Sequence, residues 1–162
     1  MASVRRRSWS PDAPMADVVD AATRSRMMAG IRGRDTRPEW LIRRGLHKLG
    51  FRYRLHARKL PGRPDLVLSK YHAAVFIHGC FWHGHDCPLF KWPKTRGDFW
   101  RTKIEGNRAR DNRAVDALTA AGWRVAIVWE CALRGSTKDS GEVVEQLAAW
   151  MISGEERIEV RG

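Results

Sequence analysis

The first long stretch of apolar residues with helical spacing covers residues 36 to 50 and predicts an amphipathic helix. Thr36 is the expected cap, and Pro38 in the first turn with Glu39 three residues after the cap completes the capping-box pattern. Gly50 is the expected end of the helix. The apolar residues expected on its buried side are Trp40, Leu41, Leu46 and Leu49.

Two later stretches also have helical spacing. Residues 99 to 121 form a long predicted helix, with Asp98 as its expected cap and Gly122 as its end. Residues 142 to 151 form a shorter amphipathic helix, and residues 23 to 29 read as a short basic helix near the start of the chain.

Strands are predicted between these helices. Residues 51 to 55 alternate apolar and basic side chains, which is typical of a half-exposed strand. Residues 65–68, 73–77 and 123–129 are apolar runs typical of buried strands. The order of elements predicts an α/β fold with one mixed sheet flanked by helices. Asp65, His78 and Cys131 each fall at a strand end, and we expect the sheet to bring them to one edge.

The length of 162 residues predicts one folded domain, which we place at residues 15–154. Residues 1–14 are rich in Arg, Ser and Pro, and we expect a disordered basic extension there. Residues 155–162 are weakly specified and are expected to form a C-terminal tail.

The chain is strongly basic, with a net charge of +12, and the first 60 residues carry 15 Lys and Arg against 5 Asp and Glu. Such a balance favours a polyanionic partner, foremost nucleic acid, although a generally basic protein is the plainer alternative. No apolar run approaches the roughly 20 residues needed to span a bilayer. No signal peptide opens the sequence, which indicates a reducing cytosol.

Residues 76 to 87 concentrate half of the six histidines and two of the three cysteines. Cys80, His85 and Cys87 are spaced for one metal, and Cys131 is the cysteine left to complete four ligands. A structural zinc site of the Cys3His type is the economical interpretation. A disulfide or small buried cysteines are the alternatives, and a reducing compartment disfavours the disulfide.

A second candidate site begins at Asp65. A Pro-Asp pair followed by an apolar strand outlines the core of a metal-dependent nuclease, in which Asp65 would hold Mg²⁺. The pattern is weak alone, since an Asp at a strand start is usually a turn residue. The next strand ends Phe76-Ile77-His78, without the acid and lysine of the usual second half of such a core.

Several longer motifs stand out along the chain. They are Ala22-Thr23-Arg24-Ser25, Arg34-Asp35-Thr36, Leu60-Pro61-Gly62-Arg63-Pro64-Asp65, His78-Gly79-Cys80-Phe81-Trp82-His83, Trp123-Arg124-Val125 and Ile127-Val128-Trp129-Glu130-Cys131-Ala132-Leu133-Arg134-Gly135. Together they resemble one known family, the very short patch repair (Vsr) DNA mismatch endonucleases. The resemblance implies a restriction-endonuclease-like fold of the PD-(D/E)XK superfamily with a structural zinc, and nicking of DNA on the 5′ side of the thymine in T:G mismatches left by deamination of 5-methylcytosine.

The resemblance also implies roles for particular residues. The zinc ligands are Cys80, His85, Cys87 and Cys131. Asp65 matches the Mg²⁺ ligand, joined by the main-chain carbonyl of Ile77, where the family can carry threonine. His83 matches the residue that activates the attacking water, and His78 a second catalytic histidine. Glu39 and Asp111 match further acids near the metal, although a capping box and a solvated helix acid are their plainer explanations.

For DNA, the resemblance implies that Phe81, Trp82 and Trp100 wedge into the duplex beside the mismatch. Met28 matches a residue entering from the minor groove, with core packing as the alternative for it and Met27, and Lys103 is a candidate contact. The implied setting is the bacterial cytoplasm at the nucleoid, as a monomer, with the mismatch-repair protein MutL and a DNA polymerase as later partners. A restriction-like nuclease on intact duplex and a zinc-stabilised, non-catalytic DNA-binding module are the competing hypotheses.

Overall fold

The computed structural model describes residues 20, 22–23, 26, 33–134 and 140–162. The chain divides into two compact units, residues 1–33 and 34–162, and the elements below all belong to the second. The expected basic extension, Met27 and Met28 lie outside the described residues, as does most of the helix predicted at residues 23 to 29. No helix of the described part is long and apolar enough to cross a membrane.

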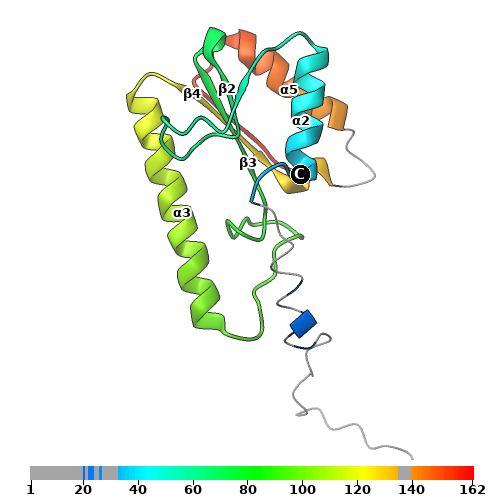
Figure 1. Ribbon diagram of the computed structural model, residues 1–162, viewed down its shortest axis with the longest axis vertical. Helices are drawn as coiled ribbons and strands as arrows, with labels where there is room; N and C mark the ends of the chain where they lie inside the picture. The colour runs from blue at the N-terminus through cyan, green and yellow to red at the C-terminus, as the bar shows by residue number, and fades with distance from the viewer. Residues whose placement is uncertain (1–19, 21, 24–25, 27–32, 135–139) are drawn as a thin grey trace, which may run out of the picture. The chain divides into compact units, whose positions relative to one another are not determined.

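A five-stranded mixed sheet forms the centre of the second unit, in the order β1-β2-β3-β4-β5 (Figure 1). The first three strands pair antiparallel, and β3, β4 and β5 run parallel. The mixed α/β architecture fits the predicted restriction-endonuclease-like class. The strands are β1 (Arg54–Leu55), β2 (Leu66–Leu68), β3 (Ala73–His78), β4 (Arg124–Trp129) and β5 (Arg157–Val160).

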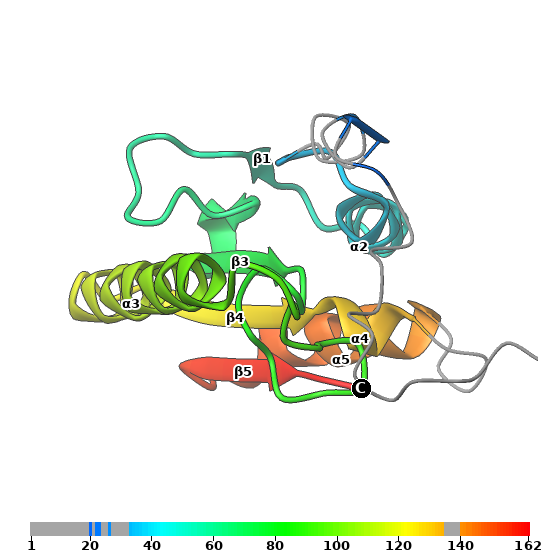
Figure 2. The same cartoon turned by 90° about the horizontal axis from the view of Figure 1, so that it is seen from below.

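Helices cover both faces of the sheet. The helices α2 (Arg37–Lys48) and α5 (Ser140–Ser153) bury their apolar side chains with one face, and α3 (Gly97–Ala120) covers the other. Seen from below, strands β3, β4 and β5 lie side by side between α3 and α5 (Figure 2). Helix α2 approaches α5 closely at Gly45. A Cβ at this position would lie only 2.3 Å from a methyl group of Val144, so the contact requires glycine.

Helix α2 begins as predicted but is rotated relative to the predicted buried face. The capping box of Thr36 and Glu39 is confirmed. The stripe expected to be buried is partly wrong, since Trp40 is 54% and Leu49 53% exposed. The rotation turns Glu39 and Arg43 inward beside the apolar residues, so that α2 presents charged groups to the interior at its N-terminal end.

Three predicted boundaries also differ. The strand expected at residues 51 to 55 is only two residues long, because Phe51 leaves the sheet to fill the core. Asp98 is not the cap of α3 but lies in its first turn, after Arg96 with a positive φ of 55°. Residues 155–162 are more than a tail, since they contain β5, which pairs with β4 along the sheet edge.

One end of the sheet collects the candidate residues. Strands β3 and β4 are parallel, so His78 and Cys131 both follow the same end, where β2 starts from Asp65 because it runs antiparallel to β3. The expectation that these three positions meet at one edge is therefore confirmed. The N-terminal half of α3 extends past this end of the sheet, with the loop of residues 79–96 beside it (Figure 1).

Candidate functional site

The four predicted zinc ligands converge in the structure. Cys80, His85, Cys87 and Cys131 each offer a ligand atom within 4.8 Å of the others. The first three come from the loop after β3, and the fourth lies on α4 (Glu130–Leu133), a single turn after β4 that sequence analysis did not anticipate. The parallel pairing of β3 with β4 carries the loop and this turn to the same place.

The donor geometry fits a tetrahedral soft metal. His85 Nδ1 lies 3.5 Å from Cys131 Sγ, which matches the ~3.5 Å edge of a tetrahedron built from ordinary Zn–S and Zn–N bonds. All three cysteines are free, so the structure contains no disulfide there. Burial and the neighbouring thiols raise the pKa of Cys80, and a bound cation would reverse this by stabilising the thiolate. The His85 ring stacks on Trp129 at 3.9 Å between centroids.

A second group pairs the two histidines of residues 76 to 87 that do not belong to the Cys/His cluster. The rings of His78 and His83 stack at 4.0 Å between centroids and 3° between planes. His83 Nδ1 is bonded to the carboxylate of Asp111, which α3 supplies. Burial lowers the pKa of His78 to about 3, so that its ring is neutral at ordinary pH. His83, held by a carboxylate and only half-buried, is the accessible member of the pair.

Asp65 lies at the centre of the same sheet end. The backbone N–H of Ile77 donates to its Oδ2 at 2.7 Å, and the imidazole Nδ1 of His56 lies 3.9 Å from Oδ1. Burial raises its pKa to about 6, the charge of Glu39 adds to that rise, and the Ile77 hydrogen bond opposes it. A carboxylate with one oxygen unclaimed by a hydrogen bond from the described residues, in a site that disfavours its charge, fits a hard divalent cation such as Mg²⁺.

Glu39 joins this group from α2. One carboxylate oxygen accepts from the backbone and hydroxyl of Thr36, and the other accepts from the Asp35 N–H and from Arg43. Its capping role and its nearness to Asp65 therefore coexist in the same side chain. Sequence analysis missed Arg43 and His56, although the four-residue spacing of Glu39 and Arg43 was a visible signal for an ion pair.

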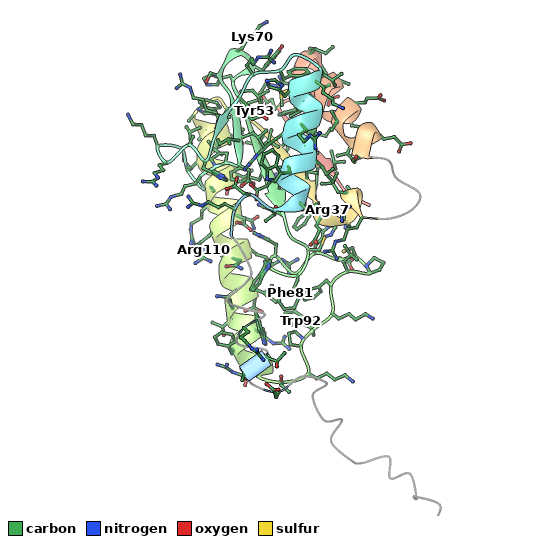
Figure 3. The ribbon with its side chains drawn as sticks, turned by 45° about the vertical axis from the view of Figure 1, so that its right-hand side comes forward. Arg37, Tyr53, Lys70, Phe81, Trp92 and Arg110 are labelled. Carbon is green, nitrogen blue, oxygen red and sulfur yellow. The ribbon has the colours of Figure 1, made fainter. Side chains whose placement is uncertain are left out.

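Aromatic side chains gather beside the metal cluster. Phe81 contacts Trp82 and Trp100 edge-on at 5.3 and 5.2 Å, and all three rings are half-buried. The Asn107 amide donates to the Trp82 carbonyl at 2.7 Å, which ties the loop to α3. Figure 3 shows Phe81 beside the N-terminal half of α3, with Trp92 further along towards the start of that helix.

Further rings and cations extend this surface beyond the predicted set. Trp92 is 48% and Phe99 46% exposed, and the guanidinium groups of Arg101 and Arg96 lie over them. Lys103 is exposed on the same helix. The eight tryptophans of the sequence are many for this length and were a signal for exposed rings such as Trp92. The count alone could not tell exposed tryptophans from buried ones.

The structure therefore brings together nearly all of the predicted residues. Asp65, Glu39, His78, His83 and Asp111 surround one end of the sheet, and the zinc-ligand set and the aromatic cluster adjoin it through the loop of residues 79–96. Met28 alone lies outside the described residues. The arrangement provides a buried carboxylate for a divalent cation and a carboxylate-oriented imidazole for proton transfer.

Comparison with known proteins gives close relatives. The sequence model of the family described as DNA mismatch endonuclease Vsr matches residues 16–89. The chain is 50% identical over 138 residues to the DNA mismatch endonuclease Vsr of Escherichia coli K12, covering 85% of this chain and 88% of that protein. It is 50% identical over 119 residues to the type II nicking enzyme V.XorIIP of Xanthomonas oryzae pv. oryzae, covering 74% and 88%. It is 45% identical over 120 residues to the type II nicking enzyme V.NmeAIP of Neisseria meningitidis serogroup A, covering 74% and 86%.

Proposed function

The chain belongs to the family of DNA mismatch endonuclease Vsr and is a DNA-nicking endonuclease, and from this premise we propose that it cuts one strand on the 5′ side of thymine in T:G mismatches, with Mg²⁺ as the catalytic ion. The observation that supports the proposal is that Asp65, bonded to Ile77, and the His78–His83–Asp111 group lie at the same end of the sheet. The wedge residues adjoin the same end, so that chemistry and mismatch opening occur side by side.

Asp65 and the main-chain carbonyl of Ile77 are the proposed ligands of the catalytic ion. When bound, Mg²⁺ supplies positive charge that stabilises the charge developing on the scissile phosphate. The Ile77 N–H fixes the Asp65 carboxylate by one oxygen and leaves the other for the cation. Isoleucine in place of threonine removes a hydroxyl at this position and keeps the carbonyl, which is the part that the proposal uses.

His83 is the proposed general base. The Asp111 carboxylate can only accept a hydrogen bond, so the bonded Nδ1 of His83 carries the proton and the opposite nitrogen, Nε2, offers a lone pair. An imidazole oriented by a carboxylate in this way can take a proton from an attacking water. The neutral His78 ring stacks on it and restricts its orientation. As the second catalytic histidine, His78 is proposed to act on the phosphate or leaving group.

Mismatch selection is assigned to the aromatic cluster. Insertion of Phe81, Trp82 and Trp100 between base pairs requires unstacking a step, which costs a few kcal/mol. A mispaired step opens at a lower cost, so the wedge favours T:G over T:A. The zinc-ligand cluster is proposed to hold the loop that carries Phe81 and Trp82 against α4. The later roles of MutL and a DNA polymerase stay predictions from the family resemblance.

A nicking assay on T:G and T:A duplexes of the same sequence, with and without Mg²⁺, tests the proposal. We expect a single-strand nick in the T:G duplex that requires Mg²⁺. Asp65→Ala should abolish nicking and keep DNA binding, and Trp82→Ala should reduce the preference for T:G. Equal cutting of both duplexes would contradict the proposed preference for mismatches. Double-strand cuts would favour a restriction-like nuclease instead, and DNA binding without any nick would favour a non-catalytic module.

A further inference from the structure

A charged side chain lies buried beside the proposed nuclease acids without a role in the chemistry above. Arg43 lies on the inner side of α2 and is only 4% exposed. Its guanidinium contacts Asp35 Oδ1 at 2.5 Å, the carboxylate of Glu39, and His56 Nε2 at 3.1 Å. Burial of a guanidinium is unfavourable unless its N–H groups are paired, and arginine does not escape by losing its proton. These three contacts pair the two terminal nitrogens and so hold the charge in its buried position, while Nε has no partner among the described residues.

The partners of Arg43 have the composition of a cation site. Asp35, Glu39 and His56 each offer a ligand atom within 4.8 Å of the others. The guanidinium already occupies the space among these atoms, with its fork bonded to both carboxylates. A metal ion there would break these pairs and leave a buried, unpaired guanidinium, which is strongly unfavourable. Arg43 is thus the resident cation of this group, and a divalent ion is left to Asp65.

His56 connects this group to Asp65. Arginine has donors only, so its contact with Nε2 of His56 is favourable when that nitrogen offers a lone pair. The neutral ring then carries its proton on Nδ1, the atom that lies 3.9 Å from Asp65 Oδ1. The backbone is tied as well, because the His56 N–H donates to the Asp65 carbonyl at 3.2 Å. Arg43 thereby sets which edge of the His56 ring faces Asp65.

We propose that Arg43 is a positioning residue of the nuclease site, which fixes the Glu39 carboxylate and the His56 ring and, through them, the setting of Asp65. The inference rests on the proposed function. Thr36 and the Asp35 N–H hold Glu39 from the side of the backbone, and Arg43 is the side chain that binds both Glu39 and His56. Loss of the guanidinium removes the link between these two groups, and a misplacement of about 1 Å at a reacting centre can slow a reaction about 100-fold.

The test compares Arg43→Gln with Arg44→Gln, which removes an exposed arginine from the next position of the same helix. Single-turnover nicking of a T:G duplex is measured at saturating enzyme and Mg²⁺, together with the Kd for the duplex and the zinc content. We expect Arg43→Gln to nick about 100-fold more slowly, with Kd and zinc content within about twofold of the wild type. Arg44→Gln should match the wild type.

A double-mutant cycle with His56→Asn separates positioning from a general loss of stability. Because Arg43 and His56 act as one unit, the double variant should be no slower than the slower single variant. Arg43→Lys keeps the buried charge without the fork and should nick at least tenfold more slowly than the wild type; it decides the matter if Arg43→Gln does not fold. Three results would overturn the proposal. Arg43→Lys could nick at the wild-type rate, or the rate losses of Arg43→Gln and His56→Asn could multiply in the double variant. The third is a loss of DNA affinity in Arg43→Gln as large as its loss of rate. Failure of the wild type to nick would defeat the proposed function instead.

Discussion

The zinc-ligand cluster and the nuclease group lie at the same end of the sheet but are built in opposite ways. Three of the four predicted zinc ligands come from residues 80 to 87, and the cluster is mostly buried. The nuclease acids and histidines come from α2, the start of β2, the end of β3, the following loop and α3, and several are half-exposed. The first arrangement suits a fixed structural ion, and the second leaves carboxylate and imidazole side chains partly accessible from solvent.

The two groups also differ in what their charges do for the fold. In the zinc-ligand cluster, burial and the neighbouring thiols raise the pKa of Cys80 and so favour its neutral thiol without a metal, and a bound ion would link the loop to α4. In the nuclease group, Asp65 is kept in a site that disfavours its charge even before DNA is bound. We therefore expect the first group to stabilise the domain and the second to reduce its stability in return for activity.

Loss of a zinc ligand should have the largest effect. Cys131→Ala and His85→Ala should each lose the metal and with it most of the domain's stability, since structural zinc contributes on the order of 10 kcal/mol to folding in small domains. Metal analysis and thermal unfolding of the purified variants measure both effects. His47→Ala, which removes an exposed histidine of α2, serves as the control. Unchanged zinc content in Cys131→Ala would falsify the assignment of this ligand.

Removal of the Asp65 charge should have the opposite effect on stability. The pKa of about 6 in the folded chain lies above the ordinary value of 3.8, so the folded state binds the extra proton between these values. This carboxyl stabilises the fold in acid, and the stabilisation is lost as the pH rises through 6. Without Mg²⁺, Asp65→Asn should therefore be more stable than the wild type at pH 7, by at most about 3 kcal/mol, although it does not nick.

Thermal unfolding of both proteins from pH 4 to pH 8 measures this difference. The gap between the two curves should be small near pH 4 and reach its full size above pH 6. The buried His78 makes the stability of both proteins rise with pH, because its pKa is lowered in the folded state. The difference in stability between wild type and variant cancels this shared contribution. Added Mg²⁺ should stabilise the wild type and leave Asp65→Asn unchanged. If the wild type is as stable as the variant at every pH, burial of the ionised Asp65 carboxylate does not destabilise the fold.

The same contrast explains what the sequence alone could predict. The Cys/His cluster was visible because three of its four residues are close along the chain and the remaining cysteine completed the set of predicted zinc ligands. Strands β2, β3 and β4 and the main helices followed from apolar spacing. Asp65, His78 and Cys131 came to one sheet end because each follows or precedes one of these strands. Roles for Glu39 and Asp111 came only from the family resemblance.

Other features depend on tertiary contacts that spacing does not encode. Helix α2 turns Arg43 inward and leaves Trp40 exposed, because the partners of Arg43 come from other parts of the fold as well as from α2. His56 has a positive φ of 47° and no motif of its own. The strand β5 has only four residues, and its pairing with β4 decides its structure.

Neutralisation of Asp111 should separate orientation from metal binding within the nuclease group. Asp111→Asn replaces the carboxylate that holds His83 Nδ1 with an amide, which no longer favours one ring orientation and tautomer. Loss of an effective general base is expected to slow single-turnover nicking about 100-fold, with Mg²⁺ dependence and DNA affinity unchanged. Asp116→Asn, an exposed acid one and a half turns further along α3, is the control. Equal rates for the two variants would leave Asp111 as a solvated helix acid.

The smallest expected effect concerns the zinc cluster again, at a contact that sequence analysis did not foresee. After β5, the Gly162 N–H donates to Cys131 Sγ at 3.3 Å, and a Cβ at Gly162 would lie 2.4 Å from the Cys131 carbonyl oxygen. Gly162→Ala must therefore move this segment away and lose the hydrogen bond to the sulfur. Because such bonds stabilise a metal-bound thiolate, we expect the variant to keep its zinc but to release it several-fold faster to a chelator.

Gly106→Ala, where a Cβ meets no atom within 4 Å, should release zinc at the wild-type rate. The same release rate in both variants would show that the Gly162 hydrogen bond does not slow zinc release, and that only the four ligands and their loop hold the ion.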